Sequence, residues 1–332
     1  MSTIPELTAR LIDGDRRALS KAITLVESRR SKDREKALEL LDKLMPHTGN
    51  SRRIAISGSP GVGKSTFIEA FGEHLISTGE RVAVLTIDPS SRLTGGSILG
   101  DKTRMPLLAN NPEAYIRPTP SGNLLGGVAR RSREVVALCE AAGYNTILIE
   151  TVGVGQSETE AATMSDCYLL LLQPGSGDTL QGIKRGIMEL ADLVIVNKAD
   201  GALLASARQS ATHYLRALSL MQNTMPDWRC PVILCSSIEK TGQEEIAQQI
   251  DRYFTLARES GSFAQKRRAQ NHQWLEDETI ADMIEQFHHD AAIQARYTQA
   301  VKQLDSGHSP ARIASHFVTQ LLKGTPKNDR ET

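Results

Sequence analysis

The sequence lacks net charge and a cysteine framework. Its 332 residues carry 39 Lys and Arg against 39 Asp and Glu, and this balance argues against a dedicated nucleic-acid-binding protein. Its 4 cysteines are too few, in a chain of this length, to form a disulfide framework. Cys230 and Cys235 do not have a usual zinc-ligand spacing, so we expect reduced, buried thiols rather than a metal site.

The chain also lacks targeting and membrane signals. Its first residues, "MSTIPELTARLIDGDRR", are polar and contain acids, unlike a signal peptide. The longest apolar run, "YLLLL" at 168–172, is too short to cross a bilayer. There is no internal repeat and no low-complexity segment. We therefore expect a cytoplasmic protein without membrane contact.

Residues 1–50 are predicted to form a helical extension, because apolar side chains recur at helical spacing. One predicted stripe consists of Leu19, Ala22, Ile23 and Val26. A second predicted stripe consists of Ala37, Leu38, Leu41 and Met45. Pro46 and Gly49 then end the pattern.

The middle of the chain, residues 51–255, alternates strand-like and helical segments. Apolar runs typical of buried strands occur at 54–57, 82–87, 146–150, 168–172, 193–197 and 232–237. This alternation predicts an α/β fold, with a mostly parallel sheet covered by helices on both faces. Ligands of such sheets bind at the carboxyl ends of the strands, so the loops there hold the candidate site.

After residue 255 the strand signals stop and a second helical extension, 256–332, is predicted. An apolar stripe is formed by Ile280, Met283, Ile284 and Phe287. A last helix is expected to begin at Pro310 with Ser309 as its N-cap.

The strongest motif is "GSPGVGKST", which follows the first strand and opens a helix. It matches the phosphate-binding P-loop in the required context. Glycines allow backbone amides to form an anion nest, to which the helix N-terminus adds positive charge. The predicted nucleotide-binding residues here are Gly58, Ser59, Pro60, Gly61, Val62, Gly63, Lys64, Ser65 and Thr66. Lys64 can reach the outer phosphates and act in catalysis, and Ser65 can bind Mg²⁺; the alternative is a chance Gly-rich turn.

A second motif, "NKAD", indicates which base is bound. The Asp200 carboxylate can accept from guanine N1–H and its amino group, whereas adenine would leave it unpaired. The Lys198 stem can cover the base, and Asn197 can fix either the loop or the purine edge. Ser236 and Ser237, after a further strand, can close the pocket. These residues favour GTP over ATP.

Several carboxylates provide candidate magnesium ligands. Asp88 ends a strand and begins the Gly- and Ser-rich stretch "DPSSRLTGGSILGDKTRM", which also contains Asp101. A loop of this length in a compact domain is usually functional or disordered. Mg²⁺ prefers oxygen ligands and keeps several waters, so Ser65, Asp88, Asp101 and Glu150 form the predicted set. The alternative is that Asp88 caps a turn and Asp101 a helix.

The stretch "ILIETVGVGQSE" is predicted to be a nucleotide switch, the alternative being a strand that simply enters a Gly-rich turn. Glu150 has the arm length to reach Mg²⁺ through a water, and the Gly153 amide can meet the terminal phosphate. Gln156 can orient water, although its spacing is not diagnostic. Asp88 is the preferred base or water-positioning group, and no strong base is needed because phosphoryl transfer depends on positioning and electrostatics.

The Gly-rich stretch "QPGSGDTLQGIKRGI" at 173–187 contains Asp178, Gln181 and Lys184. It can be a third mobile element that touches the nucleotide or a partner. From composition alone it is only a loop.

Together these segments resemble the methylmalonyl-CoA mutase-associated GTPase family, also called MeaB or ArgK. The resemblance rests on "RALSKAITLVES", "GSPGVGKST", "DPSSRLTGGSILGDKTRM", "IRPTPSGNLLGGVARR", "IETVGVGQSE", "QPGSGDTLQGIK" and "NKAD". One departure is Arg92, where the family usually has proline; it loosens the loop and adds a charge beside the predicted magnesium site.

The resemblance implies a homodimeric GTPase that acts as a chaperone for adenosylcobalamin-dependent acyl-CoA mutases. Such a protein gates cofactor loading, protects or reactivates the mutase, and hydrolyses GTP slowly until the mutase stimulates it. The resemblance places metal ligands at Ser65, Asp88, Asp101 and Glu150. It places a third switch at Asp178, Gln181 and Lys184, and a dimerisation arm in the C-terminal helices.

Three alternatives stay open. A metallochaperone GTPase usually carries His-rich tails, whereas the 8 histidines here are scattered, with only His288 and His289 adjacent. An ATP-dependent kinase or transport ATPase is disfavoured by Asp200. A non-catalytic binding module is disfavoured by the intact Lys64, Ser65 and acidic residues.

Overall fold

The computed structural model describes residues 3–28, 30–88, 104–120, 127–151, 156–175, 185–221 and 225–322. The chain divides into two compact units, Met1–His272 and Gln273–Thr332. Each is described by itself.

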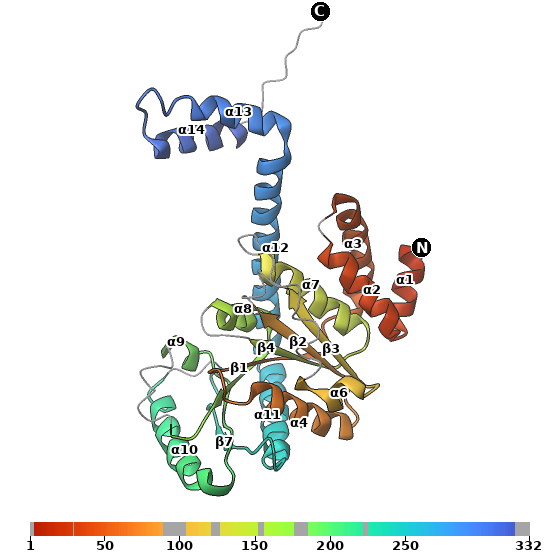
Figure 1. Ribbon diagram of the computed structural model, residues 1–332, viewed down its shortest axis with the longest axis vertical. Coiled ribbons are helices and arrows are strands. Elements are labelled where there is room, and N and C mark those ends of the chain that lie inside the picture. The colour runs from red at the N-terminus through yellow and green to blue at the C-terminus, as the bar shows by residue number, and fades with distance from the viewer. Residues whose placement is uncertain are drawn as a thin grey trace, which may run out of the picture. The chain divides into compact units, whose positions relative to one another are not determined.

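The larger unit is built on a seven-stranded sheet in the order β3-β2-β4-β1-β5-β6-β7 (Figure 1). The strands are β1 Arg52–Gly58, β2 Val82–Asp88, β3 Ala114–Pro120, β4 Thr146–Thr151, β5 Cys167–Leu172, β6 Leu193–Val196 and β7 Val232–Leu234. Every pairing in the sheet is parallel, which confirms the predicted α/β fold. The strand order reverses at β1, and this is where parallel sheets open a ligand-binding crevice.

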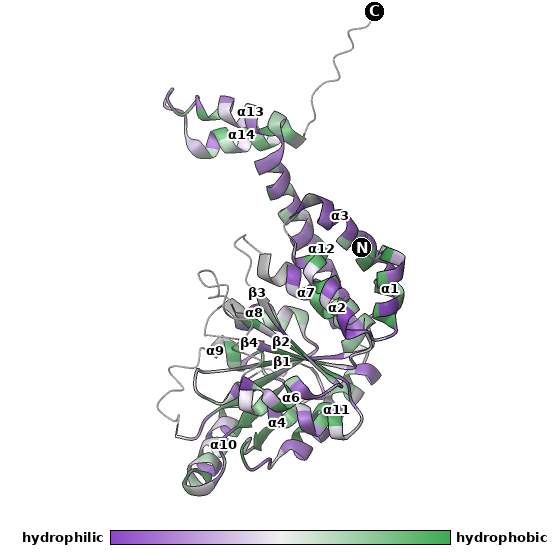
Figure 2. Ribbon diagram, turned by 45° about the vertical axis from the view of Figure 1, so that its right-hand side comes forward, coloured by the Kyte–Doolittle hydropathy of each residue, from purple (hydrophilic) through white to green (hydrophobic). Residues whose placement is uncertain are grey.

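Helices cover both faces of this sheet. The helices of the larger unit are α1 Ile4–Ile12, α2 Arg16–Glu27, α3 Ser31–Leu44, α4 Lys64–Ser77, α6 Pro106–Asn110, α7 Gly127–Ala141, α8 Gln156–Met164, α9 Arg185–Met188, α10 Leu204–Leu218, α11 Gln243–Glu259 and the first part of α12 Ser262–His289. The helices α13 Ala291–Val301 and α14 Pro310–Leu322 belong to the smaller unit. Alternate residues of β1 enter two separate cores. Ala55 packs with residues of α1–α3, α7 and α8, whereas Ile54 and Ile56 pack with α4, α6 and α11. Figure 2 shows the central strands as mainly hydrophobic.

The N-terminal helices share one hydrophobic core with the sheet. The first predicted stripe is confirmed, since Leu19, Ala22, Ile23 and Val26 are all fully buried. The second is partly wrong: Ala37 and Leu41 are buried, but Leu38 and Met45 are exposed. Leu40 and Leu44 are buried instead, because the face of α3 that meets the core follows the spacing i, i+3, i+4, i+7 from Ala37.

Strand β3 was not predicted from the sequence. Its segment "AYIRPTP" contains Pro118 and Pro120, which cannot donate a hydrogen bond to a neighbouring strand. The segment pairs with β2 alone and forms the edge of the sheet, where proline is tolerated.

The smaller unit contains the end of α12 with α13 and α14. α14 begins at Pro310, as predicted. The ring of Phe287 lies 5.1 Å from that of Tyr297 and 6.1 Å from that of Phe317, centroid to centroid. Among the described helices, none combines the length and apolarity needed to span a bilayer.

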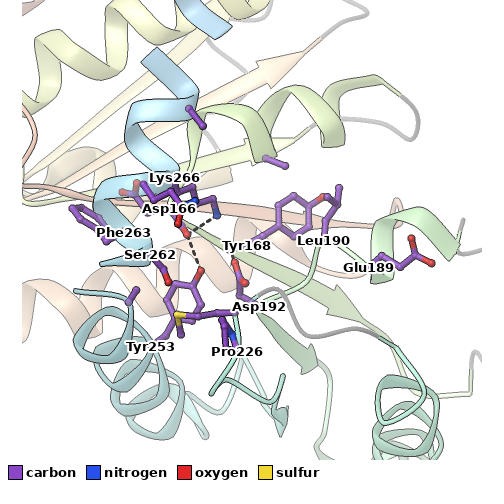
Figure 3. A pocket seen from close by; sticks show the side chains of 15 residues that line it. Asp166, Tyr168, Glu189, Leu190, Asp192, Pro226, Tyr253, Ser262, Phe263 and Lys266 are labelled. Atoms are coloured by element: carbon purple, nitrogen blue, oxygen red, sulfur yellow. Dashed lines mark hydrogen bonds between the residues drawn. The ribbon is translucent and has the colours of Figure 1, made fainter. Parts of the chain in front are cut away.

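A buried carboxylate, Asp166, ties the start of α12 to the base of the sheet. Its Oδ1 accepts from Arg53 Nη2 at 2.6 Å and its Oδ2 from Arg267 Nη2 at 2.7 Å. Its backbone oxygen accepts from Lys266 Nζ at 2.7 Å and from Tyr253 Oη at 3.1 Å (Figure 3). A cavity of about 590 Å³ lies beside this cluster, at the amino-terminal ends of β5 and β6. The P-loop lies at the other end of the strands, where their carboxyl ends are.

Replacing Asp166 with asparagine is expected to destabilise the larger unit by about 3 kcal/mol, because Arg53 and Arg267 both lose an ion pair with a buried carboxylate, although Arg267 keeps its pair with Glu140. Burial alone would raise the pKa of Asp166, but Arg53 and Arg267 lower it to about 2 from its ordinary 3.8. The folded-state pKa is the lower one, so the stabilisation is complete above about pH 4 and is lost as the pH falls toward about 2. Urea unfolding at several pH values measures both effects.

Asp251→Asn is the matched control, since Asp251 pairs with Arg52 but its side chain is 64% exposed. Its cost is expected to stay below about 1 kcal/mol. Equal stability of the Asp166→Asn and Asp251→Asn variants would contradict the anchoring role.

Candidate functional site

The P-loop connects β1 to α4 with a backbone that only glycine fits well. Gly58, Gly61 and Gly63 have φ angles of +156°, +80° and +93°. A Cβ at Gly58 would lie 2.4 Å from the Leu171 carbonyl oxygen of β5. α4 begins at Lys64, directly after this loop, so its free backbone amides and partial positive charge lie at the carboxyl end of the central strand.

Two side chains of the first turn of α4 face the loop and the neighbouring strand β4. Lys64 Nζ donates to the Gly58 carbonyl oxygen at 2.6 Å. Burial lowers the pKa of Lys64, while the carboxylates of Glu150 and Glu158 act against that shift. Ser65 Oγ donates to Glu150 Oε1 at 3.1 Å. Two of the predicted magnesium ligands, Ser65 and the buried Glu150, therefore lie together.

A cavity of about 570 Å³ lies over this turn. It is lined by Pro60, Gly61, Gly63, Lys64, Ser65, Thr66, Arg104 and Glu150. Its two cations and its amide-rich floor suit an anion.

The residues that the structure describes fit Mg²⁺ in donor type. Ser65 and Glu150 offer a hydroxyl and a carboxylate oxygen beside a phosphate cradle, and Mg²⁺ is usually bound by one or two such groups together with phosphates and waters. Within the described ranges no cluster of three or more His, Cys, Asp or Glu that could hold a metal occurs. β2 ends at Asp88 beside β4, but the Asp88 side chain and all of Asp101 lie outside the description.

Asn197 fastens the P-loop to the loop after β7. Its Nδ2 donates to the Val62 carbonyl oxygen at 2.9 Å, and its Oδ1 accepts from Ser237 Oγ at 2.8 Å. Asn197 and Ser237 are both buried. Asn197 thus contacts the P-loop backbone, which is one of the two roles that the sequence left open.

Lys198 and Asp200 of the "NKAD" motif are less buried than Asn197. Lys198 has a φ of +59°, and its Nζ donates to the Gly61 carbonyl oxygen at 2.7 Å. Ser236 Oγ donates to Asp200 Oδ2 at 2.5 Å. This hydrogen bond orients the half-buried Asp200, which follows the carboxyl end of β6 as the P-loop follows that of β1.

Several predicted residues lie outside the described part of the chain. They are Arg92, Asp101, Gly153, Asp178, Gln181 and Lys184. Gln156 opens α8, but its side chain is not described.

Arg104 was not predicted from the sequence to be a site residue. It lines the cavity with Lys64 although the two are far apart in the chain. The available signal was that an arginine stands three residues after the predicted magnesium ligand Asp101, in "DKTRM".

A family model described as "Methylmalonyl Co-A mutase-associated GTPase MeaB" matches residues 19–292. The chain belongs to the MeaB family. This confirms the resemblance stated from the motifs, and it makes the chain a P-loop GTPase.

Relatives of this MeaB-family chain cover most of its length. It is 53% identical over 272 residues to a "Putative GTPase" of Caulobacter vibrioides, covering 82% of this chain and 83% of that protein. It is 47% identical over 283 residues to GTPase ArgK of Escherichia coli, covering 85% and 86%. The crystal structure of LAO/AO transport system kinase superposes with a TM-score of 0.74 at 36% identity, covering 97% and 98%.

Proposed function

We propose that this MeaB-family GTPase hydrolyses GTP with Mg²⁺ and acts as a chaperone for an adenosylcobalamin-dependent acyl-CoA mutase. The observation that carries the proposal is the junction of the P-loop with β4 and β6. Lys64, the Ser65–Glu150 pair and Asp200 converge there at one edge of the sheet. The mutase is proposed as the partner because the matching family is described as methylmalonyl-CoA mutase-associated.

In the proposed reaction, Lys64 neutralises charge on the outer phosphates, and the start of α4 adds its amide groups. Ser65 and Glu150 would hold Mg²⁺ together with Asp88 and Asp101. When bound, Mg²⁺ would neutralise charge on the outer phosphates. Asp88 positions the attacking water.

Asp200 is proposed to select guanine by accepting from N1–H and the amino group of the base. Ser236 donates to one Asp200 oxygen and holds the carboxylate in place. The Lys198 stem would cover the base, while Ser237 supports the pocket through Asn197.

We propose that the segments following β4 and β5 change conformation on hydrolysis and so transmit the nucleotide state to the mutase. The Gly153 amide would sense the terminal phosphate in the first. Asp178, Gln181 and Lys184 would form a third switch in the second. Loss of the terminal phosphate would then rearrange both segments, gate cofactor loading, and protect or reactivate the mutase in the cytoplasm.

The C-terminal helices are proposed to be a homodimerisation arm, with domain boundaries at 1–50, 51–255 and 256–332. Leu275 and Met283 of α12 are 70% and 56% exposed, and exposed large apolar side chains favour a protein interface. Sedimentation equilibrium is expected to give a dimer, and a monomer at micromolar concentration would contradict this part of the proposal.

Complex formation tests the partner. The chain is run on size-exclusion chromatography with a purified adenosylcobalamin-dependent methylmalonyl-CoA mutase, with GDP or with a non-hydrolysable GTP analogue. Co-elution that differs between the two nucleotides is expected. Separate elution in both states would remove the mutase from the proposal and leave the GTPase.

A further inference from the structure

We propose that Arg104 binds the terminal phosphate of GTP and thereby makes the site prefer GTP over GDP. This inference rests on the proposed GTP site but adds a residue that neither the P-loop motif nor the "NKAD" motif contains. It follows from the place of Arg104 in the cavity, from its lack of a partner among the described residues, and from the way its backbone is held.

The side chains that line the cavity over α4 carry more positive than negative charge among the described residues. Within the described part of the chain, Lys64 and Arg104 are the cations that line it, against one carboxylate, Glu150. Lys64 and Glu150 already have hydrogen-bond partners in the P-loop and α4. Arg104 is exposed and makes no hydrogen bond or ion pair with any described residue. Its planar group of five donors matches the oxygens of a phosphate.

The backbone beside Arg104 is fixed to the P-loop helix itself. The Leu107 amide donates to Glu69 Oε1 of α4 at 2.7 Å. Leu108 packs against Gly72 of α4 so closely that an added Cβ there would lie 2.8 Å from Leu108 Cδ1. Met105, next to Arg104, is fully buried in the core that also contains residues of α4. The segment that directly follows Arg104 is therefore anchored to α4, the helix that opens at the P-loop.

This geometry favours the terminal phosphate over the inner ones. The inner phosphates are the natural ligands of the P-loop amides. Arg104 lines the cavity together with Lys64, Ser65 and Glu150, the groups proposed for the outer phosphates and Mg²⁺. A third phosphate adds negative charge where two cations face one carboxylate, and GDP lacks that charge.

The test compares affinities for a non-hydrolysable GTP analogue and for GDP, both with Mg²⁺, by fluorescence titration. Arg104→Ala is expected to weaken the analogue by roughly 10- to 100-fold, the usual worth of a charge-assisted hydrogen bond, and to leave GDP within about threefold. Arg104→Lys should recover part of the loss, since it keeps the charge without the fork. Arg208→Ala, which removes an exposed arginine on α10, is the matched control and should change neither affinity.

An unchanged ratio of analogue to GDP affinity in Arg104→Ala would overturn the inference. This result is distinct from failure of the proposed function, in which the unmodified chain itself would bind neither nucleotide.

Glu69 tests the positioning. Glu69→Ala removes the acceptor of the Leu107 amide and should shift the affinity ratio in the same direction as Arg104→Ala. Glu69→Gln keeps an acceptor and should restore the ratio. If Glu69→Ala keeps the ratio while its melting temperature falls, Glu69 has only a structural role and the positioning step is overturned.

Discussion

Replacing Lys64 with alanine is expected to lower GTP hydrolysis at least about 100-fold, the scale on which a single charge-stabilising group contributes to phosphoryl transfer. Lys64 is the first residue of α4. Its ammonium nitrogen lies 2.6 Å from the Gly58 carbonyl oxygen of the P-loop. It would exchange that contact for the outer phosphates. Phosphate release from Mg·GTP measures the loss.

The matched control is Lys43→Ala, which removes an exposed lysine of α3 that pairs with Glu39 on the same helix. The control is expected to keep the full rate, and both variants should melt near the parent. A Lys64→Ala variant that retains more than a tenth of the rate would contradict the assigned role.

Replacing Asp200 with asparagine is expected to weaken GTP binding by about 100-fold or more, because guanine donors then meet an amide that offers one acceptor and competing donors. Xanthine carries a carbonyl where guanine has its amino group. The side-chain amide of the Asp200→Asn variant can donate to that carbonyl, so binding of XTP is expected to rise as GTP binding falls. ATP binding, poor in the parent, should change little.

Competition titration of the three nucleotides measures this change of specificity. Asp227→Asn, on an exposed loop residue, is the matched control and should leave the order of affinities unchanged. Equal affinity of the parent for ATP and GTP would contradict base selection by Asp200 and revive an ATP-dependent activity.

The sheet could be predicted from the sequence where local pattern and tertiary environment agree. The run "TILIE" is buried along its length in β4, and a central strand tolerates apolar residues on both faces. β3 could not be predicted, because Pro118 and Pro120 argue against a strand unless its position at the edge is known. The burial of Leu40 rather than Leu38 likewise depends on which face of α3 meets the core.

The site residues also differ in how far the sequence alone predicts them. The P-loop is contiguous, so one stretch of sequence predicts its residues. Asn197 was placed in a motif, but its role depended on Val62 and Ser237, which are distant in the chain. Arg104 depends on the packing of α6 against α4, through Glu69 and Gly72. A linear pattern does not contain that contact.

The central claim joins the chemistry to the partner, and one rate measurement tests both. Phosphate release from Mg·GTP is followed with and without a purified adenosylcobalamin-dependent methylmalonyl-CoA mutase, with Lys64→Ala as the blank. We predict a slow basal rate above the blank that rises with mutase concentration and then saturates. A rate that the mutase does not change would contradict the chaperone role, and a rate no higher than the blank would contradict the hydrolase itself.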